Sequence, residues 1–155
     1  MAISPTHGHA RTSEIARYFG AASILVVGGI HAEQYYEAYS SQVPTIGTLF
    51  LLSFIGAGIV GAVLLAPVWL LGERLANLIL GVAALCAIGI ALGTLVGLLV
   101  SEYTPLFGFM ESDYRLAVVL SLLFDGLASV FLGLFVLTIG PNLVRPFRTT
   151  ARNTR

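Results

Sequence analysis

Four long apolar stretches constrain the fold of this chain more than any other feature of its sequence. They cover residues 15–36, 45–71, 75–101 and 114–139, and at about 1.5 Å per helical residue each can cross a hydrocarbon core of about 30 Å. Only 10% of the residues are charged and 57% are hydrophobic, whereas a soluble domain carries about 25% charged residues. A chain with this few polar side chains cannot cover a water-facing surface. The sequence therefore predicts a protein that is solvated by lipid.

Short polar or helix-breaking segments separate the stretches. Pro44–Thr45 marks the beginning of the second helix, and Glu73–Arg74 makes a short turn into the third. Gly140–Pro141 is expected to stop the fourth helix, because proline cannot donate a backbone hydrogen bond. Links this short favour antiparallel neighbours. The sequence therefore predicts an all-α, transmembrane, up-down four-helix bundle.

The arginines predict how this bundle is oriented. The chain has no lysine, and seven of its eight arginines lie in or next to the two tails, residues 1–14 and 140–155, or in the turn after the second helix: Arg11, Arg17, Arg74, Arg145, Arg148, Arg152 and Arg155. The other two loops hold only Arg115, at a helix start. Under the positive-inside rule both tails are cytoplasmic, and residues 15–139 form the membrane domain. The opposite face then collects acidic residues: Glu33, Glu37, Glu102, Glu111 and Asp113. We expect a location in a bacterial plasma membrane, with the acidic loops extracytoplasmic.

Several classes of site are excluded by what the sequence lacks. Cys86 is the only cysteine, so an intrachain disulfide, a CxxC pair and a multi-cysteine zinc site are impossible. No P-loop, dinucleotide glycine fingerprint or GxSxG motif occurs, so there is no evidence for a nucleotide cofactor. The basic residues are few and lie at the predicted cytoplasmic side, and a nucleic-acid partner is not expected.

Three glycines indicate a packing face on the third helix. Gly89, Gly93 and Gly97 are spaced i, i+4 and i+8, and a row of this kind lets another transmembrane helix approach closely. The partner could be the second helix of the same chain or a second copy of the protein. The sequence leaves both interpretations open.

Asp125 is the most informative single residue. It lies about eleven residues into the predicted fourth helix, hence about 16 Å along its axis and near the membrane centre. An ionised carboxylate there is unfavourable by about 2.5–3.5 kcal/mol, which favours a neutral, hydrogen-bonded acid. Ser121 and Ser129 flank it at i−4 and i+4, and Ser53 falls at a similar depth. This polar group is either a proton-handling or ligand-binding site, or a structural hydrogen bond between helices.

The segment GGIHAEQYYEAY, residues 28–39, places polar groups at the end of the first helix. His31 with Glu33 and Glu37, joined by Glu102 from the other outer loop, contains ligand types that hold zinc, copper, manganese or iron. A metal ion is therefore a candidate cofactor. The alternative is that His31 bonds a neighbour at the interface while the glutamates face water.

Two stretches of the sequence carry a resemblance. HAEQYYEAYSSQVPTIGTLFLL, from His31, and GTLVGLLVSEYTPLFGFMES, followed by a fourth helix that contains Asp125, are similar to segments of uncharacterised small four-helix integral membrane proteins common in actinobacteria. The similarity extends over about residues 20–135. It implies a four-helix bundle and a role for His31 and Asp125, and it implies no reaction. Those proteins have an arginine where this chain has Glu102.

The sequence thus favours a non-enzymatic integral membrane protein, a subunit or accessory factor of a larger membrane assembly. Its expected partners are the lipid bilayer and either other membrane subunits or further copies of itself. One alternative is a small metal- or redox-cofactor-handling protein with its His/Glu site on the outer face. Another is an oligomeric proton-coupled transporter that uses Asp125.

Overall fold

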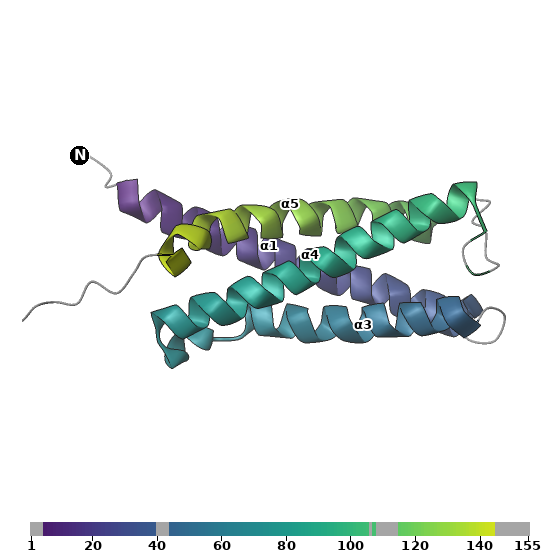
Figure 1. The fold of residues 1–155 in the computed structure, drawn as a ribbon, viewed down its shortest axis with the longest axis horizontal. Helices are drawn as coiled ribbons and strands as arrows, with labels where there is room; N and C mark the ends of the chain where they lie inside the picture. The colour runs from purple at the N-terminus through teal and green to yellow at the C-terminus, as the bar shows by residue number, and fades with distance from the viewer. Residues whose placement is uncertain (1–4, 40–43, 106, 108–114, 145–155) are drawn as a thin grey trace, which may run out of the picture.

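A computed structural model describes residues 5–39, 44–105, 107 and 115–144 of the chain. These residues form four long helices and two short ones, and no strand occurs within the described ranges. Helix α1 (Pro5–Gln34) continues into a π-helical turn, η1 (Tyr35–Tyr39), and α3 (Pro44–Leu65) is followed by a short 3₁₀ helix, η2 (Val68–Leu71). Helices α4 (Glu73–Tyr103) and α5 (Leu116–Val144) complete the bundle (Figure 1). The expectation of an all-helical chain is confirmed.

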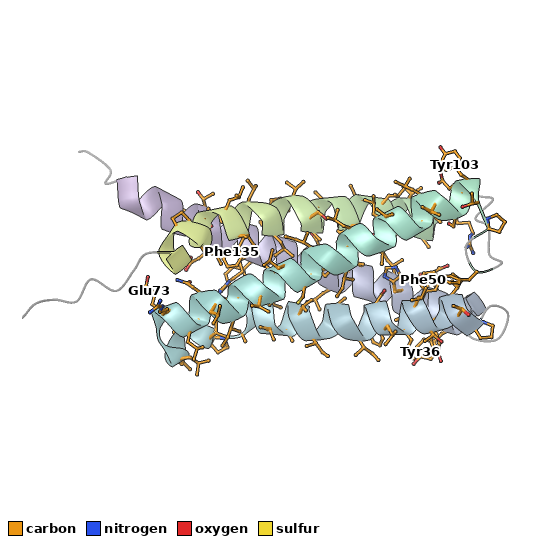
Figure 2. All side chains as sticks on the ribbon, viewed as in Figure 1. Tyr36, Phe50, Glu73, Tyr103 and Phe135 are labelled. Atoms are coloured by element: carbon orange, nitrogen blue, oxygen red, sulfur yellow. The ribbon has the colours of Figure 1, made fainter. Side chains whose placement is uncertain are left out.

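The four long helices α1, α3, α4 and α5 are each long and apolar enough to cross a membrane. Their outward faces carry large apolar side chains, and Ile59, Leu70 and Leu137 are each more than 60% exposed. Figure 2 shows such side chains along the outside of the bundle, with Tyr36 and Tyr103 at one end and Glu73 at the other. An outward surface of this kind suits lipid, with tyrosines where the hydrocarbon meets water.

The helices surround the core in the order α1, α3, α4, α5. Helix α1 packs against α3 and α5, α4 packs against the same two helices, and α1 and α4 scarcely touch. Small side chains make this packing close, because Ala84, Ala87 and Ala91 of α4 are completely buried. A hydrogen bond of 3.0 Å between the hydroxyls of Ser13 and Thr138 joins the beginning of α1 to the end of α5. These two helices are therefore antiparallel.

Helix α4 does not run alongside α3 for its whole length. The two helices lie close together near η2 and diverge towards the other end, where α4 approaches α5 (Figure 1). As a result, α3 and α4 pack less extensively than the other neighbouring pairs, although a short link connects them. This divergence leaves the half of the bundle that contains the end of α4 open between α3 and α4.

Several helix boundaries differ from the predicted ones. Helix α1 begins at Pro5, about ten residues before the apolar stretch, because proline is well accommodated in the first turn. Helix α3 ends at Leu65, since Pro67 removes a backbone donor and restricts the residue before it. The expected stop at Gly140–Pro141 is wrong: α5 continues to Val144. Pro141 lies so close to the end of α5 that its missing N–H group removes only one hydrogen bond of the last turn, and the helix continues past it.

The expected packing of the α4 glycines against another helix of the same chain is also wrong. Nothing lies within 4 Å of a Cβ placed at Gly89, Gly93 or Gly97. The closely packed glycines lie elsewhere: a Cβ at Gly20 would be 2.5 Å from Leu132 Cδ2, and one at Gly61 would be 2.5 Å from Leu25 Cδ2. Gly20 of α1 and Gly61 of α3 therefore allow leucine side chains of the neighbouring helices to approach their backbones closely.

We predict that Gly20→Ala destabilises the bundle by about 1–3 kcal/mol, because a new methyl group must displace the fully buried Leu132. The matched control is Gly58→Ala, where a Cβ meets nothing within 4 Å. This control should leave stability unchanged or raise it by up to about 1 kcal/mol through helix propensity. Unfolding in detergent, followed by circular dichroism, measures the difference, and equal stabilities in the two variants would contradict the packing described.

Candidate functional site

An open crevice lies where α3 and α4 diverge. Its volume is about 370 Å³, and all four long helices contribute to its lining. Phe50 and Leu49 of α3 form one wall, and Figure 2 shows Phe50 on the α3 side of the gap. Five polar side chains share the lining: His31, Ser53, Thr94, Ser101 and Ser121. The site is thus mostly apolar with a few polar groups, as in sites that bind small molecules.

The opposite wall is built from the α4 glycines. Gly89, Gly93 and Gly97 line the crevice together with Ile90 and Leu98 of the same helix. Because these glycines carry no side chain and touch no neighbouring helix, their row creates the open volume that a larger residue would fill. The spacing of the glycines indicated that one face of α4 differs from the others, and in the structure this face borders a cavity. Whether a second copy packs against it stays a prediction.

His31 points into the bundle. Its side chain is only 4% exposed, and its ring lies against Phe50, with 5.2 Å between the ring centroids and 33° between the planes. Its hydrogen-bonding neighbour is the backbone of Val27, one turn earlier on α1, but Nδ1 is buried and has no partner of good geometry in the described part of the chain. A buried polar atom without a partner is unfavourable. It marks a position where a bound molecule could supply the missing partner.

Asp125 lies behind the crevice on α5 and is completely buried. Ser121, one turn earlier, donates a hydrogen bond of 3.0 Å from Oγ to Oδ2 of Asp125. Thr94 of α4 is a further side-chain hydrogen-bond partner of this carboxyl, while Oδ1 has no partner of good geometry among the described residues. Ser129 donates instead to the backbone carbonyl of Asp125, at 2.8 Å, and does not line the crevice. The predicted polar residues therefore have different surroundings. Ser121 lines the crevice and bonds to the Asp125 carboxyl, and Ser53 lines the crevice from α3. Ser129 bonds only to the backbone of its own helix.

The structure does not assemble the predicted metal site. His31 is buried, Glu33 and Glu37 are exposed, and Glu102 is half-buried. In the described ranges there is no group of three or more histidine, cysteine or acidic side chains that could hold a metal ion. The geometry has a simple cause, since residues spaced i and i+2 on a helix, such as His31 and Glu33, point in different directions. Glu111 and Asp113 lie outside the described residues.

Sequence reasoning overlooked the apolar residues of the lining and, among its aromatic and polar residues, Phe50, Thr94 and Ser101. The two hydroxyl residues had a usable signal, because Thr94, Gly97 and Ser101 are spaced i, i+3 and i+7 on one helical face. Phe50 had none, since nothing in the sequence distinguishes it from the other aromatic residues that face lipid.

Arg17 is a buried arginine of α1, far from the crevice and near the other end of the bundle. It was predicted only as part of the basic cytoplasmic side, yet its side chain is 7% exposed. Its Nη2 donates to the Tyr18 hydroxyl at 2.6 Å, and its guanidinium carbon lies 4.5 Å from the centre of the Tyr18 ring. The tyrosine thereby stabilises this cation through a hydrogen bond and a cation–π contact.

Comparison with known proteins adds no further constraint, because no protein-family model, curated protein or solved structure matches the chain. The function must be argued from the crevice itself. Its described lining contains one histidine, several hydroxyl groups and apolar walls, and Ser121 is bonded to Asp125 without a histidine as its partner. This is a set of groups suited to binding.

We predict that Ser121→Ala destabilises the protein by about 1–2 kcal/mol, since it removes a donor from the buried Asp125 carboxyl. Ser129→Ala is the matched control on the same helix, and it removes a bond to a backbone carbonyl of the helix itself. The control should change stability by no more than about 0.5 kcal/mol. Unfolding in detergent tests the pair, and a loss in Ser121→Ala no larger than that in Ser129→Ala would contradict the prediction.

Proposed function

We propose that the protein is a non-enzymatic integral membrane protein that holds a small amphipathic molecule between α3 and α4. In this capacity it serves as a subunit or accessory factor of a larger membrane assembly. The observation that carries the proposal is the crevice of about 370 Å³, which falls within the range of small-molecule sites, about 300–1,000 Å³. Four helices able to cross a membrane place such a site within reach of molecules dissolved in the bilayer.

The division of the lining supports an amphipathic occupant. The walls are apolar, from Phe50, Leu49 and Leu98, and suit a hydrocarbon body. Two of the polar groups, His31 and Ser121, come from α1 and α5, the two helices on the far side of the gap. A molecule arriving sideways between α3 and α4 would place its polar end against these two residues and leave its apolar part towards the lipid.

The role as a subunit or accessory factor is supported by the limited chemistry of the site. In the described part of the crevice, no nucleophile is paired with a histidine base and no metal group is formed. A protein that binds a molecule without transforming it can present that molecule to a partner, or use it to stabilise a contact with another membrane subunit. A second copy of this chain is one such partner.

The test is to isolate the protein in lipid nanodiscs and to identify, by mass spectrometry, the small molecules that remain bound. We predict that the wild type retains a stoichiometric amphipathic molecule and that Gly93→Leu loses it, because leucine fills the volume bordered by this glycine. Gly58→Leu is the matched control, since its position is also unobstructed but does not line the crevice. The control should retain the molecule.

Two results would contradict the crevice as a binding site. One is a wild-type protein that is folded and monodisperse in nanodiscs and carries no bound molecule beyond bulk phospholipid. The other is equal retention in Gly93→Leu and Gly58→Leu, which would place the bound molecule elsewhere on the surface.

We also propose that both termini are cytoplasmic and that the protein lies in a bacterial plasma membrane with its acidic loops outside. The distribution of arginines supports this orientation. When the chain is expressed in a bacterium, a green fluorescent protein fused to its C-terminus should be fluorescent, and an alkaline phosphatase fused to the same end should be inactive. An active phosphatase at this end would reverse the orientation.

Two rival interpretations stay predictions. A metal site at His31, Glu33, Glu37 and Glu102 would require acidic side chains to move towards a buried histidine, and metal content with and without His31→Ala decides it. Proton-coupled transport through an oligomer is favoured by the complete burial of Asp125. Unchanged pH-dependent flux in Asp125→Asn would exclude that mechanism.

A further inference from the structure

We infer that the crevice selects a neutral molecule whose polar end donates hydrogen bonds, a hydroxyl or phenol group, over molecules whose polar end only accepts them. This inference rests on the proposed function, because it names the chemical class of the molecule bound between α3 and α4. It depends on where the protons of the lining hydroxyl groups are directed.

Two hydroxyl groups of α4 donate within the protein. Thr94 Oγ1 lies 3.0 Å from the backbone carbonyls of Ile90 and Ala91, and Asp125 of α5 is a further acceptor for its proton. Ser101 Oγ donates to the carbonyl of Leu98 at 2.7 Å. A hydroxyl has one proton and two lone pairs. Because each proton is directed to a backbone carbonyl or, for Thr94, to the Asp125 carboxyl, these oxygens face the crevice as hydrogen-bond acceptors.

Ser121 is arranged in the same way by a different partner. Its proton is donated to Oδ2 of Asp125, which is completely buried and does not itself line the crevice. Asp125 is therefore a positioning residue: it fixes the Ser121 hydroxyl so that its lone pairs are available to a ligand. Thr94, Ser101 and Ser121 thus form a set of three acceptors on α4 and α5.

The charges of the lining residues narrow the chemical class of the ligand further. No described residue of the lining carries a fixed charge, and His31 is the only one that can become cationic. An anionic polar end, such as a phosphate or carboxylate, would lose its hydration without gaining a cation. It would also face the lone pairs of the three acceptors. A neutral hydroxyl donates to these acceptors and can accept from His31 or Ser53, so an alcohol or a hydroquinone fits the lining.

The experiment measures binding of two matched pairs of probes to the protein in nanodiscs by equilibrium dialysis. The aromatic pair is tetramethylhydroquinone, kept reduced with dithionite, and tetramethylbenzoquinone, which only accepts hydrogen bonds. The aliphatic pair is decanol and its methyl ether. Binding to empty nanodiscs is subtracted for each probe. We expect the hydroxyl member of at least one pair to bind about tenfold more tightly than its partner, the equivalent of one hydrogen bond.

Three variants test the role of Asp125. Asp125→Leu removes the acceptor of the Ser121 proton, which frees that hydroxyl to donate to a ligand, and should reduce the preference for hydroxyl probes about threefold or more. Asp125→Asn keeps an acceptor oxygen and should keep the preference. Ser129→Ala, whose hydroxyl does not line the crevice, should behave as the wild type. The ratio within a pair is informative even where overall affinity falls.

The outcomes separate this inference from the proposed function. A preference within the aromatic pair alone identifies a hydroquinone-like molecule, one within the aliphatic pair alone a long-chain alcohol, and both support donor selection. Equal binding within both pairs, lost in Gly93→Leu, overturns donor selection and leaves the crevice as a binding site. If none of the four probes binds, or if their binding is unaffected by Gly93→Leu, both donor selection and the crevice as a binding site are overturned.

Discussion

In a bilayer, backbone groups can find hydrogen-bond partners only within the protein, and every feature of this fold follows from that constraint. It makes each apolar stretch a helix and leaves the helices to be joined by van der Waals contact and by a few polar bonds. Contact of this kind depends on small residues at the crossing points. Gly20 and Gly61 accept leucine side chains, and Ala84 and Ala87 are completely buried on α4.

The crevice results from an uneven distribution of such contacts. Helix α4 is held closely by α5, which leaves less contact with α3, its neighbour in sequence. The alanines of α4 face the core, while its row of glycines borders the gap. An opening in the membrane domain therefore arises without any break in a helix. Because the backbone bonds of α4 remain internal, the opening can face lipid at little energetic penalty.

The polar groups give this opening its chemical character. They come from different helices, His31 from α1, Ser53 from α3 and Ser121 from α5, and they line a common volume. Asp125 stands behind them and orients the hydroxyl in front of it. Groups that are unfavourable one by one in a hydrocarbon interior become a binding surface when they converge. The open atoms, Nδ1 of His31 and the lone pairs of the hydroxyls, are those a ligand would use.

The sequence by itself determined that the chain forms four helices long and apolar enough to cross a membrane, and it singled out His31, Asp125 and the α4 glycines. Hydrophobic length and the rarity of polar residues in lipid decide these points locally. The same reasoning failed for the helix ends near Pro5 and Pro141. It also could not show that His31 and the glutamates near it point in different directions, because this depends on the burial of each side chain. Only the tertiary structure decided that the glycines border a cavity, because the crossing angle of α4 depends on packing summed over all four helices.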